Sequence, residues 1–245
     1  MSAEWTSEAA LKPALRIEDA LVIAIESSTR VASVAVSFRG RTIESSLASE
    51  RAHASDLLPS IDRALRSLGA TPKDIRAIVV GTGPGSYTGL RVGIATALGI
   101  ARASGAAILA VPSGETLAFG ALAPGAEALM LLDARSGELY FARYRRTADE
   151  VQVVVAPRVI VAADVPALVA LDATARNLPI FGDATVAEAA NLDDAARQRL
   201  VADATPKASA LLALGTARLA RGLVHRLDEV EPLYLRPFAA TERKR

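Results

Sequence analysis

The sequence predicts an α/β protein that is built from two copies of one plan. Each half of the chain opens with a buried strand that ends on an acidic residue, Glu26 in the first half and Asp133 in the second. Further strands and then helices follow in both halves, which is the order of an internally duplicated α/β architecture. The chain has 245 residues, of which 51% are hydrophobic, so it can form a substantial core.

The first half contains alternating strands and helices. Residues 31–38 alternate between apolar and polar or small side chains, as a half-buried strand does, and Arg39–Gly40 forms a turn. The helix that follows has one apolar stripe and ends at Gly69; the stripe contains Leu57, Leu58, Ile61, Leu65 and Leu68. The expected elements are strands at 21–29, 31–38 and 42–50, a helix at 53–69, a strand at 75–80, a helix to about 103, a strand at 106–111 and a helix after Pro112.

The second half begins after the best boundary in the chain, Ala123 to Gly125. Its expected elements are strands at 127–134, 137–146 and 150–157, a helix at 163–175, a strand at 178–182 and further helices, the last at 206–223. We therefore expect an N-terminal extension at 1–20, a first lobe at 21–123, a second lobe at 124–238 and a tail at 239–245.

Composition excludes several functional classes. The 28 basic and 27 acidic residues nearly balance, so the total charge gives no footprint for nucleic acid. There is no cysteine, which excludes disulfides and thiol nucleophiles, and the two histidines, His53 and His225, argue against a metal–histidine cluster. No apolar run approaches the roughly 20 residues of a membrane span, and the N-terminus does not read as a secretory signal. We expect a cytoplasmic protein with no membrane contact.

A glycine-rich stretch at Val79–Ala101 raises the question of phosphate binding. It lacks the lysine that a P-loop needs, and its glycines do not complete a dinucleotide-binding fingerprint. The helix N-terminus that follows can still attract an anion. Ser86 and Thr88 can instead cap this end themselves, and we favour that interpretation.

The helix after the glycine loop carries a ridge of very small side chains, spaced four residues apart: Gly89, Gly93, Ala97 and Ala101. Each glycine inside a helix costs about 1 kcal/mol relative to alanine, so the ridge must serve close packing. Two interpretations fit, one in which the ridge packs inside its own domain and one in which it meets another protein. Replacing Gly93 by leucine distinguishes them. If the ridge is internal, the leucine should prevent folding, whereas if the ridge meets another protein, the monomer should stay folded and association should fail.

Polar residues at the ends of the two opening strands are a second candidate site. Acids beside hydroxyl turns suit magnesium-phosphate binding between two lobes; the residues are Glu26, Ser27, Ser28, Thr29 and Asp133. The alternative is that they cap their own turns. No nucleophile elbow and no H-E-x-x-H pattern is present, and neither histidine is expected to be catalytic.

Five stretches together resemble the TsaB (YeaZ) family. They occur in that family's order from Leu21 to about Pro237 and read "IAIESST" with "VASVAV", "HASDLLPSIDRAL", "GTGPGSYTGLRVGIATALGIA", "LLDARSGELY" and "EPLYLRP". The chain has Glu26 where the family usually has Asp, and Tyr87 where Phe is common. The resemblance implies an actin/Hsp70/sugar-kinase-like (ASKHA) fold, with two lobes that each hold a mixed sheet and helices.

The resemblance also implies a function, that of a non-catalytic accessory subunit in threonylcarbamoyladenosine synthesis on tRNA. The expected partners are the transferase TsaD in a heterodimer, the ATPase TsaE in a ternary complex, tRNA through the complex, and a second copy when TsaD is absent. No cofactor of its own is expected, since ATP and magnesium would be held mainly by the partners. The resemblance places these residues at the partner interface: Leu57, Leu58, Ile61, Leu65, Gly83, Gly85, Ser86, Tyr87, Thr88, Gly89, Arg91, Gly93 and Ala97.

Two other functions stay open at this point. A nucleotide-binding kinase or ATPase of the same fold would use Glu26, Thr29 and Asp133, which the resemblance otherwise makes vestigial. A peptidase would need a nucleophile or a metal site that the sequence does not display. Binding of ATP and magnesium by the chain alone would distinguish the first of these from an accessory subunit.

Overall fold

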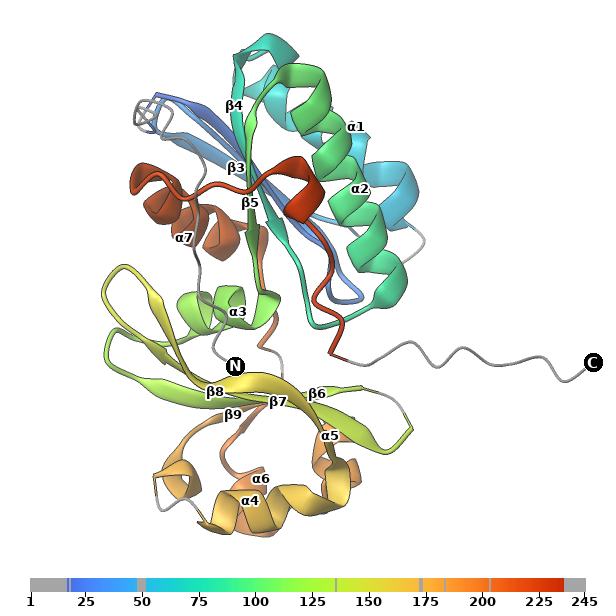
Figure 1. Cartoon of the computed structure of the whole chain (residues 1–245), viewed down its shortest axis with the longest axis vertical. Coiled ribbons are helices and arrows are strands. Elements are labelled where there is room, and N and C mark those ends of the chain that lie inside the picture. The colour runs from blue at the N-terminus through green and yellow to red at the C-terminus, as the bar shows by residue number, and fades with distance from the viewer. Residues whose placement is uncertain are drawn as a thin grey trace, which may run out of the picture.

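The structure is a computed structural model, and it describes residues 17, 19–47, 52–134, 136–171, 174–182, 184–202 and 204–235. Its strands form two five-stranded sheets, stacked one above the other with helices between and outside them (Figure 1). Of the predicted extension at 1–20, only Ile17, Asp19 and Ala20 are described, and the predicted tail at 239–245 lies outside the described residues.

The first sheet has the strand order β3-β2-β1-β4-β5. β1 pairs antiparallel with β2, which pairs antiparallel with β3, whereas β4 and β5 continue parallel to β1. Arg39 and Gly40 both have positive φ and form the tight turn between β2 and β3, as predicted. The strands are β1 (Leu21–Glu26), β2 (Ser33–Phe38), β3 (Arg41–Ser46), β4 (Ile75–Gly81) and β5 (Ala107–Val111).

The second sheet has the same arrangement of strands as the first sheet, in the order β8-β7-β6-β9-β10. Its first three strands again pair antiparallel, and β9 and β10 again continue parallel to the opening strand. The strands are β6 (Glu127–Asp133), β7 (Glu138–Arg146), β8 (Val151–Val161), β9 (Ile180–Phe181) and β10 (Leu200–Val201). The same order and directions in both halves confirm the predicted duplicated, two-lobed fold.

The helices complete five layers (Figure 1). α1 and α2 cover the outer face of the first sheet, α3 and α7 lie between the sheets, and α4, α5 and α6 cover the outer face of the second. The α-helices are α1 (Ala52–Ser67), α2 (Tyr87–Ser104), α3 (Ser113–Ala121), α4 (Val165–Leu171), α5 (Ala184–Ala189), α6 (Asp194–Arg197) and α7 (Ala208–Ala220). Short 3₁₀ turns lie at Pro72–Asp74, Ala162–Asp164, Ala175–Asn177 and Leu227–Glu229.

Strand β1 is buried along its whole length because helices cover both of its faces. Leu21, Ile23 and Ile25 point to the core beneath α1 and α2, whereas Val22 and Ala24 point to α7 on the other face. This alternation is the two-residue period of a strand. It explains why the strand reads as a continuous apolar run in the sequence.

The two middle helices are exchanged between the lobes. α3 belongs to the first half of the chain but packs against β6, β7 and β8 of the second sheet. α7 lies in the second half of the chain, within the predicted second lobe, but packs against β1, β2, β4 and β5 of the first sheet. The strands keep to the predicted halves, and the helices link them.

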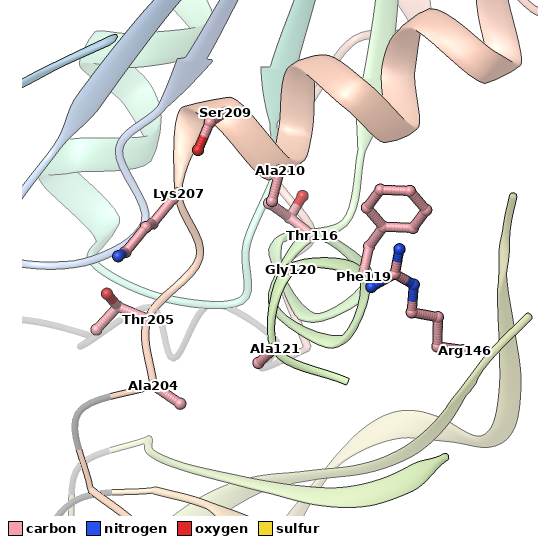
Figure 2. Close-up of a pocket in the computed structure, with 10 residues that line it drawn as sticks. All are labelled: Thr116, Phe119, Gly120, Ala121, Arg146, Ala204, Thr205, Lys207, Ser209 and Ala210. Carbon is pink, nitrogen blue, oxygen red and sulfur yellow. The ribbon is translucent and has the colours of Figure 1, made fainter. Parts of the chain in front are cut away.

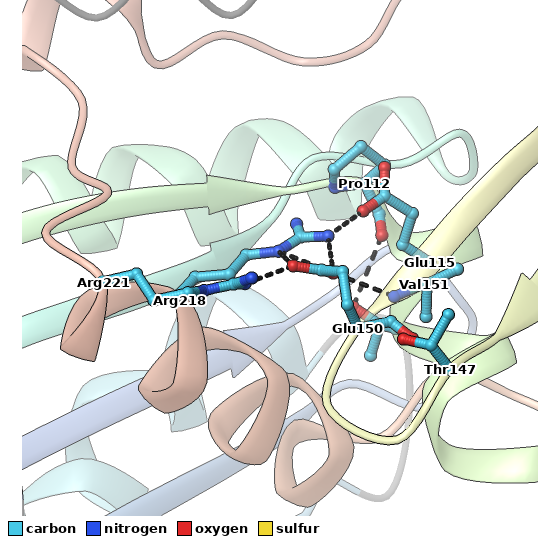
Figure 3. Close-up of polar contacts among 8 residues, drawn as sticks. Pro112, Glu115, Thr147, Glu150, Val151, Arg218 and Arg221 are labelled. Atoms are coloured by element: carbon cyan, nitrogen blue, oxygen red, sulfur yellow. Dashed lines mark hydrogen bonds and ion pairs between the residues drawn. The ribbon is translucent and has the colours of Figure 1, made fainter. Parts of the chain in front are cut away.

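A polar cluster joins these two helices to the second sheet (Figure 3). Arg218 on α7 pairs with Glu115 on α3 and with Glu150 in the β7–β8 turn, and Arg221 pairs with Glu150. Burial raises the pKa of Glu115, and the Arg218 charge partly offsets this. Burial alone would also raise the pKa of Glu150, but the hydrogen bonds from Arg218, the Val151 N–H and Arg221 outweigh it and lower that pKa.

No helix in the described part of the chain is both long enough and apolar enough to cross a bilayer. The longest of them, α2, spans Tyr87–Ser104 and lies with one face against the first sheet. Burial of that single face accounts for its apolar residues.

Candidate functional site

The glycine loop between β4 and α2 caps its own helix. Ser86 is the N-cap residue of α2, and its Oγ accepts a hydrogen bond from the Gly89 N–H at 3.3 Å. The loop is also tied down at both ends of its backbone. The Ser86 N–H donates to the Ser28 carbonyl at 2.7 Å, and Gly83 exchanges hydrogen bonds with Ser113 at 2.7 and 3.0 Å. The self-capping interpretation is thus confirmed for Ser86, whereas Thr88 lies inside α2 and is not its cap residue. The cap occupies one of the N–H groups that an anion would otherwise use.

The same loop closes over the polar end of β1. Glu26, Ser27 and Ser28 are all buried. A Cβ added at Gly85 would lie 2.1 Å from the Ser28 carbonyl oxygen, so glycine alone permits this approach. The loop therefore packs directly against the turn after β1.

Of the two interpretations of the strand-end residues, the structure supports for Glu26 the one in which the side chain caps its own turn. Its Oε1 accepts hydrogen bonds from the Ser28 N–H at 2.9 Å and the Ser113 hydroxyl at 3.1 Å inside the protein. Thr29 is half-buried, and Asp133 is exposed at the end of β6 in the other lobe. Because the glycine loop folds back over the end of β1, Glu26, Ser27 and Ser28 are enclosed, and of the five predicted residues only Thr29 and Asp133 keep some exposed surface.

Burial raises the pKa of Glu26, although hydrogen bonds from Ser28 and Ser113 act in the opposite direction. Because the pKa of Glu26 is higher in the folded than in the unfolded chain, the neutral carboxyl contributes its full stabilisation at pH values below 4.5, the pKa of the unfolded chain. That contribution is lost as the pH rises from there through the raised pKa, by up to about 1.4 kcal/mol per pH unit.

Glu26→Gln should remove this dependence, because the amide does not titrate. Above pH 4.5 the free energy of unfolding of the wild type should fall relative to that of Glu26→Gln. Urea unfolding of both proteins between pH 4 and 8 measures the difference. Parallel curves would contradict a buried, titrating Glu26.

The small-residue ridge on α2 faces the chain's own sheet. Gly89, Gly93, Ala97 and Ala101 are all buried. A Cβ added at Gly93 would lie 2.1 Å from the Ser27 Oγ and 3.5 Å from a methyl carbon of Ile25 on β1. Of the two interpretations that the sequence left open, internal packing is the one that the structure supports.

Seven of the predicted interface residues are therefore inside the chain, and we correct their assignment. They have no surface to offer a partner, because they pack beneath the loop or between the helices and the first sheet; they are Leu57, Ile61, Leu65, Gly83, Gly89, Gly93 and Ala97. Gly85 and Ser86 are half-buried. Tyr87, Thr88, Arg91 and Leu58 remain exposed.

The opposite side of α2 carries a second series of residues spaced four apart, and all are exposed: Arg91, Ala95, Gly99 and Ala103. Nothing in the described structure lies within 4 Å of a Cβ added at Gly99. The adjacent helix α1 contributes Leu58, whose exposed fraction is 56%. We call Leu58, Arg91, Ala95 and Gly99 together the outer face of α1 and α2.

Gly99 distinguishes this outer face from an ordinary solvated surface. A helical glycine is destabilising by about 1 kcal/mol relative to alanine, and no internal contact of Gly99 requires it. Small residues on an exposed helix allow a second helix to approach its backbone closely. The four-residue spacing of small residues after Arg91 is visible in the sequence. The buried ridge on the other side of α2 has the same spacing, so spacing alone does not show which side is exposed.

A cavity lies elsewhere, at the crossing of α3 and α7 (Figure 2). Its volume is about 470 Å³, and its polar lining includes Thr116, Arg146 and Lys207. Arg146 is already engaged, since its guanidinium donates to the Leu122 carbonyl at 2.6 Å and lies 4.4 Å from the Phe119 ring centroid. The described residues contain no group of histidines, cysteines and acids that could hold a metal ion.

Comparison with known proteins places this geometry in a family. The family described as "TsaD: tRNA N6-adenosine threonylcarbamoyltransferase" matches residues 45–243, most of the chain. The Escherichia coli protein named tRNA threonylcarbamoyladenosine biosynthesis protein TsaB is 32% identical over 57% of this chain. The chain belongs to the TsaB family. The match spans 64% of the length of that E. coli relative, just under two thirds.

Two further proteins are similar to this chain, one in sequence and one in both sequence and structure. An uncharacterized protein of Mycobacterium tuberculosis is 36% identical over 61% of this chain and 69% of its own length. The solved structure of YeaZ from Pseudomonas aeruginosa is 28% identical, with a TM-score of 0.73 over 88% of this chain and all of that chain. The expected family and the expected fold class are both confirmed.

Proposed function

We propose that this chain is a non-catalytic accessory subunit in threonylcarbamoyladenosine synthesis on tRNA, and that it acts by binding TsaD through the outer face of α1 and α2. The observation that carries the proposal is Gly99, an exposed helical glycine with open space above it. The names of the relatives support the proposed pathway, since the relatives in E. coli and Bacillus subtilis are named as biosynthesis proteins for this modification.

The partner follows from the family. A chain that matches the TsaD family over most of its length should share with TsaD a similar pair of outer helices. Two similar surfaces can pair about an approximate two-fold axis, each presenting the same helices to the other. Small side chains at Ala95 and Gly99 would allow close backbone approach, and the exposed Leu58 lies on the neighbouring helix α1, so this surface suits helix-to-helix packing.

The same surface accounts for the other expected partners. A second copy of this chain would use the outer face when TsaD is absent, because the pairing surfaces are alike. TsaE and tRNA would then associate with the complex, and the proposal is that this complex acts in the cytoplasm. The enclosed Glu26 favours an accessory role over nucleotide chemistry in this chain, as its carboxyl is not accessible to a bound phosphate.

Leu58→Asp tests the surface. A charge at the centre of an apolar contact should weaken binding of TsaD from the same cell at least 30-fold, because the carboxylate would be desolvated without a partner. Val161→Asp is the matched control, since Val161 is 51% exposed but lies on β8 of the other lobe. Titration calorimetry measures both.

If Leu58→Asp and Val161→Asp bind TsaD with equal affinity, the outer face is not the binding surface. Heat from ATP and magnesium with this chain alone would instead support the nucleotide-binding alternative. An accessory subunit predicts no such heat, and predicts that the chain raises the rate of tRNA modification by TsaD.

A further inference from the structure

An exposed aromatic cluster lies at the start of α2 and joins two distant segments of the chain. The rings of Tyr87 and Tyr234 lie 5.7 Å apart between centroids at an angle of 33°. The Arg91 guanidinium lies 5.1 Å from the Tyr87 ring centroid, and it donates to the Tyr87 hydroxyl at 2.5 Å. Tyr87 and Tyr234 nevertheless remain 44% and 43% exposed. We call these three residues the tyrosine platform.

The segment that carries Tyr234, residues 222–235, runs along the edge of the first lobe after α7 (Figure 1, red). We call it the C-terminal strap. The His225 N–H donates to the Ile108 carbonyl at 2.8 Å, and the Ala110 N–H donates to the His225 Nδ1 at 3.2 Å. Val230 is buried in the core beneath α1 and α2.

The far end of the strap is held at the glycine loop, where the Leu233 N–H donates to the Thr82 carbonyl at 2.8 Å. Tyr234 therefore takes its place beside Tyr87 through contacts spread along the strap. A side chain whose backbone is fixed in this way loses little further freedom on binding.

The composition of the tyrosine platform favours a protein partner. Tyrosine and arginine are the residue types that most often carry binding energy in protein interfaces. Nucleic acid requires a basic surface, but Glu231 lies close enough to act electrostatically on Tyr234, and the whole chain has a net charge of only +1. Arg91 belongs both to the platform and to the outer face, so the two surfaces are continuous.

We propose that the C-terminal strap forms a second part of the TsaD-binding surface, with Tyr234 as its contact residue. This inference rests on the proposed function, because it names the same partner. The aromatic rings present apolar area at one end of the outer face, and Arg91 beside the Tyr87 ring suits a carboxylate on the partner. In the sequence, Tyr234 is notable only as a member of the stretch "EPLYLRP".

A single-cysteine experiment tests the inference. The chain has no cysteine, so Tyr234→Cys introduces a unique thiol. Its reaction with a maleimide, followed by the mass of this chain, should slow at least tenfold when TsaD is added. Leu223→Cys is the matched control, because Leu223 is 37% exposed on the same strap. It should react at the same rate with and without TsaD.

An affinity measurement on Tyr234→Ala complements the labelling. Binding of TsaD should weaken at least tenfold, whereas Leu223→Ala should bind as the wild type does. If TsaD binds the wild type but Tyr234→Cys still reacts at its free rate, the strap is not part of the interface. If tRNA alone slows the reaction, the platform binds nucleic acid and the inference is overturned. If TsaD binds no form of the chain, the proposed function itself fails.

Discussion

Gly93→Leu is expected to prevent stable folding, whereas Gly99→Leu on the same helix is expected to leave the chain folded. A leucine at position 93 would have to enter the space held by Ser27 and Ile25, where even a Cβ would lie 2.1 Å from the Ser27 Oγ. Overpacking of a closed core with several added carbons should lower the free energy of unfolding by more than about 3 kcal/mol.

Gly99 offers the matched control, since nothing lies within 4 Å of a Cβ at that position. Leucine is a better helix former than glycine, so Gly99→Leu should raise the free energy of unfolding by about 0.5–1 kcal/mol. Urea unfolding followed by circular dichroism measures both variants. Equal stability of Gly93→Leu and the wild type would mean that α2 does not pack on the sheet through this ridge.

Arg218→Met should destabilise the chain by about 3 kcal/mol near neutral pH, because it leaves the buried Glu115 carboxylate without its cation. Arg221→Met is the control from the end of the same helix. Its side chain is 50% exposed and pairs with the partly exposed Glu150, so its loss should cost less than about 1 kcal/mol.

The deficit of Arg218→Met should also depend on pH. Burial already raises the pKa of Glu115, and loss of the Arg218 charge should raise that pKa further. A neutral Glu115 is then favoured in the folded state, so the variant should recover stability as the pH falls and lose it as the pH rises. Thermal unfolding at several pH values measures this trend. A deficit that is the same for both arginines would contradict a buried ion pair.

Much of the fold could be predicted from the sequence because strands and helices differ in the period of their apolar residues. The alternation of Val34 and Val36 and the buried runs at 21–26 and 127–133 correspond to β2, β1 and β6. The strand β10 (Leu200–Val201) was not expected, since two residues carry no period. The packing of α7 on the first sheet depends on contacts between halves, which no local pattern encodes.

The candidate site was predicted only in part, for a physical reason. Both sides of α2 carry small residues four apart. The side that is buried is decided by its contacts with Ile25 of β1 and with Ser27 just after β1, which the helix sequence does not show. Leu58 was placed on the apolar stripe of α1, but it is exposed beside Leu57, which is buried. Only the contacts between elements show that Gly93 is buried and Gly99 is exposed.

The proposed binding of TsaD by the outer face of α1 and α2 can be tested by measuring the mass of the two proteins in a mixture. Purified chain and TsaD from the same cell would be mixed and passed through light-scattering chromatography, with Gly99→Leu in parallel. We predict the mass of a one-to-one heterodimer for the wild type and separate masses for the folded Gly99→Leu variant. A wild type that forms no complex, or a Gly99→Leu variant that forms the same one, would contradict the claim.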